Sequence, residues 1–122
     1  MNLIDSPALQ LATRFLDLAA YRQQLVAGNI ANIDTPGYHT RDIDFQQELQ
    51  RSLAASSSGS TTVKPKPEEV PGLMQRPDGN NVSVDRESML LAETQLQFKA
   101  ATAILRAEFS EIHTAIREGQ SS

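Results

Sequence analysis

The chain of 122 residues contains no cysteine and no tryptophan, and aromatic residues make up only 5% of it. Without cysteine, neither a disulfide framework nor a thiolate metal site can form. Hydrophobic residues reach 39%, which is little for a small domain, since small domains already bury a smaller fraction of their surface. The composition therefore favours one small domain whose core is completed by a partner.

Long apolar runs and blocks of basic residues are also missing. No stretch of about 18 consecutive apolar residues occurs, so no membrane-spanning helix is expected. The formal net charge is −4 and the basic residues are scattered, which argues against a nucleic-acid or anionic-membrane surface. The first residues carry neither a basic stretch nor an apolar core, so no secretory signal peptide is expected. By these criteria alone the protein would stay in the cytosol.

Residue patterns that support catalysis or cofactor binding are absent as well. The two histidines, His39 and His113, stand far apart in the sequence without cysteine, so they form no metal-ligand pattern. Asp42, Asp44 and Glu48 do not follow the spacing of a calcium-binding loop and are better explained by helix capping. No Ser-His-Asp order and no glycine-rich phosphate loop occurs. We therefore expect neither enzymatic activity nor a cofactor.

A long first helix is predicted over residues 7–32. Ser6 can cap its N-terminus, and Pro7 suits the first helical position because its missing N–H would have no intrahelical partner. Apolar residues form two adjacent rows at helical spacing, which together make a wide apolar stripe. The first row contains Leu11, Phe15, Leu18 and Leu25, and the second contains Ala12, Leu16, Ala19, Val26, Ile30 and Ile33. At about 40 Å, this helix is longer than any compact core that the remaining residues could build.

The middle of the chain predicts a short helix followed by a long irregular loop. Phe45, Leu49 and Leu53 recur every four residues and form one apolar ridge that ends at residues 54–55. A serine- and threonine-rich linker and several proline and glycine turn signals follow. We expect the loop, residues 56–82, to be mobile in solution and to order as extended chain or as a short hairpin against a neighbouring molecule.

The C-terminal segment predicts a second long helix. It should begin near Ser83 or Asp85 and end at residues 116–118, with Gly119 as its stop signal. Large apolar residues repeat there at a strict interval of seven, which is typical of coiled-coil packing. These residues are Leu91, Phe98, Leu105 and Ile112.

Both ends of the chain thus contribute to one all-α unit. We predict two long amphipathic terminal helices packed as an antiparallel coiled-coil-like pair, with a short helix and an extended loop between them. The N-terminal part is residues 1–55, the loop is residues 56–82 and the C-terminal helix is residues 83–122. Within the molecule, the row Leu11, Phe15, Leu18 and Leu25 is expected to pack against Leu91, Phe98, Leu105 and Ile112. The remaining apolar residues of the first helix are left to contact neighbouring subunits, and these are Leu16, Val26, Ile30 and Ile33.

A turn motif follows the first helix. Thr35 precedes a proline and is pushed towards extended geometry, while Pro36 fixes its own φ and Gly37 can take a positive φ. Proline and glycine at the two central positions predict a type II turn. Asn29 and Asn32 lie on one helical face just before it. Their amides could bond to the backbone or to a neighbouring helix, or could simply be solvated.

This stretch resembles the N-terminal signature of bacterial flagellar rod and hook proteins, and its continuation resembles the proximal-rod members most. The match runs over residues 25–45. The residues that carry it are Asn29, Ile30, Asn32, Asp34, Thr35, Pro36, Gly37, Tyr38, Arg41, Asp42, Asp44 and Phe45. A weaker resemblance, at the level of the pattern, covers the C-terminal segment from residue 82.

The resemblance implies a structural subunit of the flagellar basal-body rod in the periplasmic space, exported by the flagellar export apparatus without a cleaved signal. Its partners would be copies of itself, other rod proteins and the basal-body adaptor or export gate beneath the rod. The apolar rows alone fit another hypothesis equally well, namely a soluble helical adaptor or chaperone that binds an amphipathic partner helix in a groove. Weak helicity with concentration-dependent self-association would favour the rod subunit.

Overall fold

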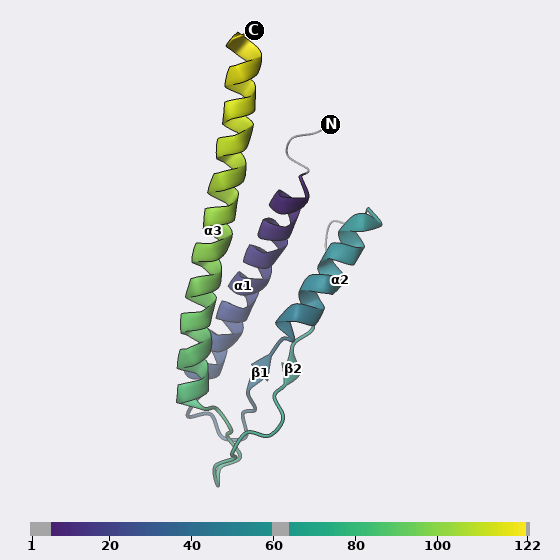
Figure 1. The fold of residues 1–122 in the computed structure, drawn as a ribbon. Coiled ribbons are helices and arrows are strands. Elements are labelled where there is room, and N and C mark those ends of the chain that lie inside the picture. Colours follow the sequence, from purple (N-terminus) through teal and green to yellow (C-terminus); the bar gives the residue numbers. More distant parts are fainter. Residues whose placement is uncertain (1–5, 60–63, 122) are drawn as a thin grey trace.

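Three helices and one pair of very short strands make up the computed structural model, which describes residues 6–59 and 64–121 (Figure 1). In chain order the elements are α1 (Pro7–Ala31), β1 (Arg41–Asp42), α2 (Phe45–Ser57), β2 (Glu68–Glu69) and α3 (Val84–Ser121). The predicted helical class is confirmed, and so is the packing of two long terminal helices with a shorter helix between them in sequence.

The residues at both ends of α1 explain its length. Ser6 Oγ accepts a hydrogen bond from the N–H of Leu9 at 3.1 Å, and Pro7 occupies the first turn. At the other end Asn32 caps the helix, and its side chain donates to the carbonyl of Gly28 at 2.8 Å. The predicted start is therefore confirmed, and the predicted end is confirmed to within one residue.

The two long helices lie side by side and antiparallel. Ser6, just before α1, donates to Glu108 Oε2 at 3.5 Å, whereas Asn29, near the end of α1, donates to Glu87 Oε2 at 3.2 Å. Because α1 has 25 residues and α3 has 38, they span about 37 Å and about 57 Å. The last turns of α3 therefore extend beyond α1, as Figure 1 shows. We call residues 109–121 the free end of α3.

Small residues form the seam between α1 and α3. Ala12, Ala19 and Val26 follow one another at seven-residue steps on one face of α1, and all three are buried. On α3 the matching buried positions include Thr94 and Ala101. Side chains of this size let two helix backbones approach closely. The heptad pitch expected for a coiled-coil-like pair is thus present on α1, although alanine and valine carry it there rather than the leucine row.

A different flank of α1 receives α2. The rings of Phe15 and Phe45 meet edge to face, with centroids 5.0 Å apart and an interplanar angle of 75°. Asp44 caps α2 by accepting a hydrogen bond from the N–H of Gln47 at 3.2 Å. The helix continues to Ser57, which is two residues further than the apolar ridge predicted, since serine and alanine at its end do not break a helix.

A short antiparallel strand pair, which the sequence did not predict, ties the long loop to the rest of the chain. Its register pairs are Arg41 with Glu69 and Asp42 with Glu68. The ladder is extended by a hydrogen bond from the N–H of Val70 to the carbonyl of Thr40 at 3.0 Å. The described part of the loop, residues 64–82, therefore orders against the chain itself rather than only against a neighbour.

The C-terminal end of α3 also differs from the prediction. The helix runs to Ser121 and so passes through Gly119, which was expected to stop it. A glycine inside a helix costs only about 1 kcal/mol relative to alanine, and no proline follows it. The glycine alone is therefore too weak a signal to end the helix.

Candidate functional site

Two tight turns from distant parts of the chain meet where α1 ends. In the first, the N–H of Tyr38 donates to the carbonyl of Thr35 at 3.2 Å and Gly37 has a φ of 75°, which is the geometry expected of a type II turn. In the second, the N–H of Gly79 donates to the carbonyl of Arg76 at 2.9 Å. The backbones of the two turns touch, because the N–H of Gly37 donates to the carbonyl of Asp78 at 2.9 Å.

Glycine is required in the second turn for space as well as for backbone conformation. Gly79 has a φ of 87°, in the left-handed region that other residues rarely adopt. A Cβ added to it would lie 3.2 Å from the Cα of Gly37. The contact between the turns therefore depends on a missing side chain.

The buried side chain of Asn80 holds the two turns together through hydrogen bonds. Its side chain is fully buried, and its amide donates to the carbonyls of Asn32 at 2.8 Å and Thr35 at 2.9 Å. Its Oδ1 accepts a hydrogen bond from the N–H of Val82 at 2.9 Å. One side chain thus satisfies two carbonyls of the α1 turn and one amide of its own loop, which fixes the position of the loop just before α3.

Asn81 forms hydrogen bonds with residues that follow the first turn. Its Oδ1 accepts from the N–H of Thr40 at 2.6 Å, and its backbone carbonyl accepts from the hydroxyl of Thr40 at 3.3 Å. Its own N–H donates to the carbonyl of Tyr38 at 3.2 Å. Residues on both sides of the first turn are therefore held by this consecutive pair of asparagines.

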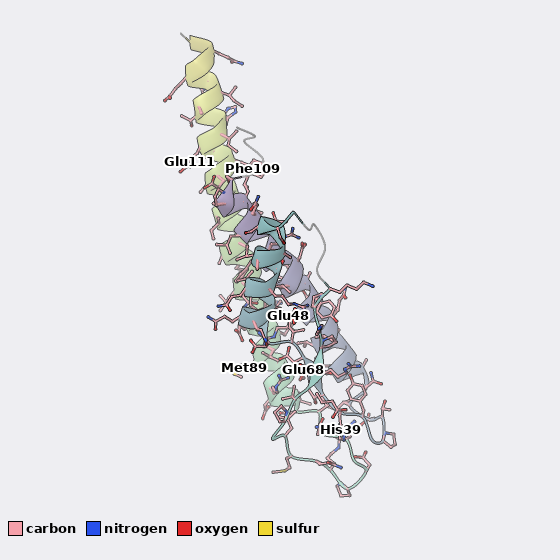
Figure 2. All side chains as sticks on the ribbon, turned by 90° about the vertical axis from the view of Figure 1, so that its right-hand side faces the viewer. His39, Glu48, Glu68, Met89, Phe109 and Glu111 are labelled. Atoms are coloured by element: carbon pink, nitrogen blue, oxygen red, sulfur yellow. The ribbon has the colours of Figure 1, made fainter. Side chains whose placement is uncertain are left out.

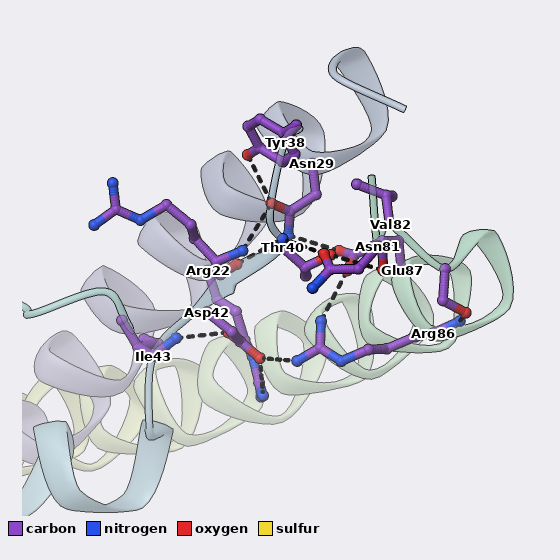
Figure 3. Close-up of polar contacts among 12 residues, drawn as sticks. Arg22, Asn29, Tyr38, Thr40, Asp42, Ile43, Asn81, Val82, Arg86 and Glu87 are labelled. Atoms are coloured by element: carbon purple, nitrogen blue, oxygen red, sulfur yellow. Dashed lines mark hydrogen bonds and ion pairs between the residues drawn. The ribbon is translucent and has the colours of Figure 1, made fainter. Parts of the chain in front are cut away.

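Asn29 connects α1 to the segment after the turn and to α3 (Figure 3). Its side-chain amide pairs with both backbone groups of Arg41, since Nδ2 donates to the carbonyl at 2.9 Å and Oδ1 accepts from the N–H at 3.1 Å. The same Oδ1 accepts from the hydroxyl of Tyr38 at 2.9 Å, and Nδ2 also donates to Glu87. Of the alternatives left open for this residue, bonding to backbone and to another helix is the one observed.

A buried carboxylate between two arginines completes the site. Arg22 donates twice to Asp42, from Nε to Oδ1 at 3.1 Å and from Nη2 to Oδ2 at 3.0 Å. Arg86 of α3 donates to Asp42 Oδ2 at 2.6 Å and to Glu87 Oε1 at 2.8 Å. Charges of alternating sign thus run from α1 through β1 to α3. We call Arg22, Asn29, Tyr38, Asp42, Arg86 and Glu87 the polar junction (Figure 3).

The junction shifts the acidity of two of its members. Burial alone raises the pKa of Asp42, but the hydrogen bonds and charge of Arg22, the N–H of Ile43 and the hydrogen bond of Arg86 outweigh it and leave the pKa below its ordinary value. Burial raises the pKa of the Tyr38 hydroxyl, and the nearby Glu87 carboxylate adds to this against the opposing charge of Arg41. Asp42 is therefore held ionised and Tyr38 is held neutral as a hydrogen-bond donor.

The residues of the sequence motif divide among the polar junction, the turn after α1, the surface and the contact with α2. Six of them make the side-chain or turn contacts described above, namely Asn29, Asn32, Thr35, Gly37, Tyr38 and Asp42. Four others have exposed positions, namely Ile30, Asp34, Pro36 and Arg41, the last of which joins through its backbone. The remaining two, Asp44 and Phe45, cap α2 and pack it against α1.

Sequence reasoning missed half of the junction. Arg22, Arg86 and Glu87 look like ordinary charged positions on amphipathic helices, and the Asn80-Asn81 pair looks like a loop. The available signal was weak: two consecutive asparagines directly after a Pro-Asp-Gly turn and directly before a helix can cap local backbone. Nothing in the spacing indicates that they bond to a turn more than 40 residues earlier.

The structure distributes the two apolar rows of α1 differently from the expectation. In the first row Leu18 is buried, Phe15 and Leu25 are half-buried, and Leu11 is 41% exposed. In the second row Val26 is 2% exposed and belongs to the seam with α3, so it has no surface to offer a neighbour. The physical reason is that α2 covers the first row from the side of Phe15, which leaves the small residues of the second row to meet α3.

The other members of these rows lie at the margins of the helix pair. On α1, Leu16 and Ile33 are half-buried and Ile30 is 41% exposed. The α3 row is half-buried throughout, and its members are Leu91, Phe98, Leu105 and Ile112. An open hollow of about 340 Å³ between the helices brings Val26, Ile30 and Leu91 together. Residues assigned to opposite roles thus line one groove.

Large apolar side chains stand exposed along α3. Besides Val84 at the first position of the helix, Leu96 is 67% and Phe109 61% exposed, and the other members of this exposed set are Met89, Ile104 and Ile116. They lie both on the outer face of the helix and on its free end, where Figure 2 shows Phe109 beyond the other two helices. Met89, Leu96 and Ile104 lie within about 80° of one another around the helix axis, whereas Phe109 and Ile116 lie on the opposite side.

Neither a metal-binding cluster nor a membrane-spanning helix is found in the part of the chain that the structure describes. Among residues 6–59 and 64–121, no cluster of histidine and acidic side chains could hold a metal ion. None of the helices described here is long and apolar enough to cross a bilayer.

Comparison with known proteins gives a consistent result. No family model matches the chain. The flagellar basal body rod protein FlgB of Escherichia coli (strain K12) is 30% identical over 130 residues, which cover 92% of this chain and 94% of that protein. The FlgB proteins of Salmonella typhimurium and Borrelia hermsii are 31% and 27% identical, over 92% and 96% of this chain and 94% and 100% of their own lengths.

These similarities extend over nearly the whole of each protein. They agree with the resemblance that residues 25–45 carry by themselves. The extent and level of identity show that the chain belongs to the FlgB family of flagellar basal body rod proteins, which are structural components of the basal body rather than enzymes.

Proposed function

We propose that the protein is a structural subunit of the proximal rod and that it polymerises through its two terminal helices. The polar junction sets the angle between the end of α1 and the start of α3, and the exposed faces of these helices then bind neighbouring subunits. Assembly with rod components follows from the family. The proposed neighbours are copies of the chain, other rod proteins and the basal-body adaptor or export gate beneath the rod.

The observation that carries this proposal is the apolar surface of α3. Between residues 89 and 105 the helix contains only two charged residues, Glu93 and Lys99, although just one of its faces packs against α1. A helix segment with so few charges is normally covered on more than one of its faces. Leu96, on the outer face, is the clearest case of a side chain that needs a partner.

The first helix supports the same conclusion. Its C-terminal part carries no charged residue from position 23 to position 33, and it presents Ile30 beside the hollow that it forms with α3. Leu16 and Ile33 are half-buried at the margins of the helix pair. We propose these residues, together with the free end of α3, as contacts between subunits in the periplasmic rod, which the chain would reach through the flagellar export apparatus.

Two leucines on α3 provide a matched test. Leu96 is exposed and Leu90 is 6% exposed, and both lie in the same helix within two turns of each other. Leu96→Asp should change the stability of the monomer by no more than about 0.5 kcal/mol, because surface substitutions rarely do more. Leu90→Asp places a charge in the seam with α1, so it should unfold the monomer.

Each variant would be expressed in cells that lack their own copy of the gene, and subunit abundance and purified basal bodies would be examined. We expect Leu96→Asp to be abundant but absent from rods, and Leu90→Asp to be degraded. Normal rods built from Leu96→Asp would show that the outer face of α3 makes no contact between subunits. Wild-type protein that is missing from purified basal bodies would favour a soluble adaptor or chaperone instead.

A further inference from the structure

The distal half of α3 carries two rows of residues at seven-residue steps, one of them basic and the other containing a carboxylate. The basic row is Lys99, Arg106 and His113, and the other row is Ile104 and Glu111. Arg106 and His113 directly follow residues of the half-buried row, whereas Ile104 and Glu111 directly precede them. Because consecutive helical residues are rotated by about 100°, the two rows lie on opposite flanks of the helix.

The basic flank contains a preformed hole. Four exposed residues, Lys99, Thr102, Ala103 and Arg106, surround a hollow of about 330 Å³, with Phe98 at its edge. They stand at positions i, i+3, i+4 and i+7. This diamond of four residues is what receives a side chain from a facing helix in knobs-into-holes packing. The hollow contains apolar surface from Phe98 and Ala103 and is rimmed by two positive charges.

The acidic flank contains a side chain suited to fill such a hole. Ile104 is 44% exposed, although it also lines the apolar hollow that α3 forms with Leu11 and Phe15. Glu111 lies one heptad further along the same row and is exposed on the free end of α3 (Figure 2). This flank therefore presents the aliphatic side chain of Ile104, with the carboxylate of Glu111 two turns further along the helix.

The seven-residue spacing decides how the two flanks fit together. If Ile104 of a second copy enters the hole between Lys99 and Arg106, a parallel α3 carries Glu111 of that copy to the next hole, between Arg106 and His113. An antiparallel α3 would carry the same carboxylate towards the hole between Ala92 and Lys99, which has one basic side chain, whereas the hole between Arg106 and His113 has two. The larger number of basic partners for Glu111 therefore favours the parallel arrangement.

From this complementarity we infer that the basic flank of α3 binds the acidic flank of α3 in a second, parallel copy of the chain. The inference rests on the proposed function and names the partner of the α3 surface. Because the two flanks are different surfaces, the contact is heterologous and leaves one flank free on each outer copy. Repetition of such a contact gives an open array of subunits that all point the same way.

Charge exchange between copies tests the inference. Arg106→Glu and Glu111→Lys each place like charges opposite one another in a parallel pair, whereas the double variant restores the opposite signs with the positions exchanged. The two residues are five apart, so they are not neighbours within one helix. Glu68→Lys, an exposed reversal in β2 away from the free end of α3 (Figure 2), serves as the control.

Self-association of the purified chains would be measured by sedimentation velocity over a range of concentrations, with helicity checked by circular dichroism. We expect each single variant to associate about tenfold more weakly than wild type. The double variant should return to within about threefold of wild type, and the control should not differ from it.

A double variant that associates no better than the single variants would overturn the inference. So would a wild-type chain that stays monomeric at every concentration but is still found in purified basal bodies, since its α3 partner would then be a different rod protein. Absence of the wild-type chain from basal bodies is a separate result, and it would count against the proposed function rather than against the pairing of flanks.

Discussion

Replacing Asp42 by asparagine should destabilise the protein more than any surface charge change. The carboxylate lies between Arg22 and Arg86 and is only 8% exposed, so solvent cannot take over its role. Asparagine keeps the shape but removes the charge and turns an NH₂ donor towards guanidinium donors. Removing one partner of a buried ion pair costs about 3 to 5 kcal/mol, because the remaining charge is left uncompensated. For a small domain this is a large fraction of the total stability.

The free energy of unfolding of Asp42→Asn would be compared with that of Glu69→Gln, using urea and circular dichroism. Glu69 pairs with His39 at 3.3 Å on the surface, and such pairs contribute about 0 to 1 kcal/mol. We expect the first variant to lose several times more stability than the second. A loss for Asp42→Asn no larger than that for Glu69→Gln would refute the view that the junction is a structural clamp.

The pH dependence provides an internal check on the same residue. Because the pKa of Asp42 is lowered on folding, its contribution is fully present above its ordinary value of 3.8 and is lost as the pH falls through the folded-state pKa. The stability gap between wild type and Asp42→Asn should therefore be constant at neutral pH and should close in strong acid. A gap that closed well above pH 4 would point to another titrating group.

The remaining predictions concern the two turns. Gly79→Ala should destabilise the protein by about 1 kcal/mol more than Gly72→Ala, because both glycines have a positive φ but only Gly79 has another backbone within reach of a new Cβ; equal melting temperatures would contradict this. Gly37→Val should abolish swimming while Ser58→Val should not, since valine is strongly disfavoured at a φ of 75° and Ser58 has an ordinary φ of −93°. Swim-plate assays of the two strains would decide, and equal motility would show that the turn has no role in assembly.

The helices of this chain were predictable because local signals determine them. Ser6 and Pro7 fix the start of α1, and Asp44 fixes the start of α2. The strand pair and the junction were not predictable, because their bonds join residues far apart in the sequence. Asn29 is the clearest example: its side-chain amide replaces a β-strand partner for the backbone of Arg41, and no spacing rule reveals such a contact.

The sequence also did not determine which apolar row of α1 packs against α3. Large apolar residues are expected in the main helix contact, so the row with Phe15 was paired with α3. In the structure alanine is buried in that contact at positions 12 and 19, and Phe15 packs on Phe45 at the edge of the hollow that α1 forms with α3. Hydrophobic periodicity finds a helix face but does not say which of two partners it meets, and here the short middle helix competes for the larger residues.

One end of the helix pair is held by buried hydrogen bonds, whereas the other end exposes apolar side chains. This difference suits a subunit that assembles with others. At the junction end, buried polar groups such as Asn29 and Asn80 find partners within the chain, so geometry there is fixed before any neighbour arrives. At the other end α3 runs on beyond α1, and Phe109 is 61% exposed there. Helices in water owe most of their stability to packing, so we expect residues 109–121 to be less stable than the part of α3 that lies against α1 until a neighbouring subunit covers them. Under the proposed function, the junction would set the angle between the helices at one end, and the last turns of α3 would remain for a neighbouring subunit to cover at the other.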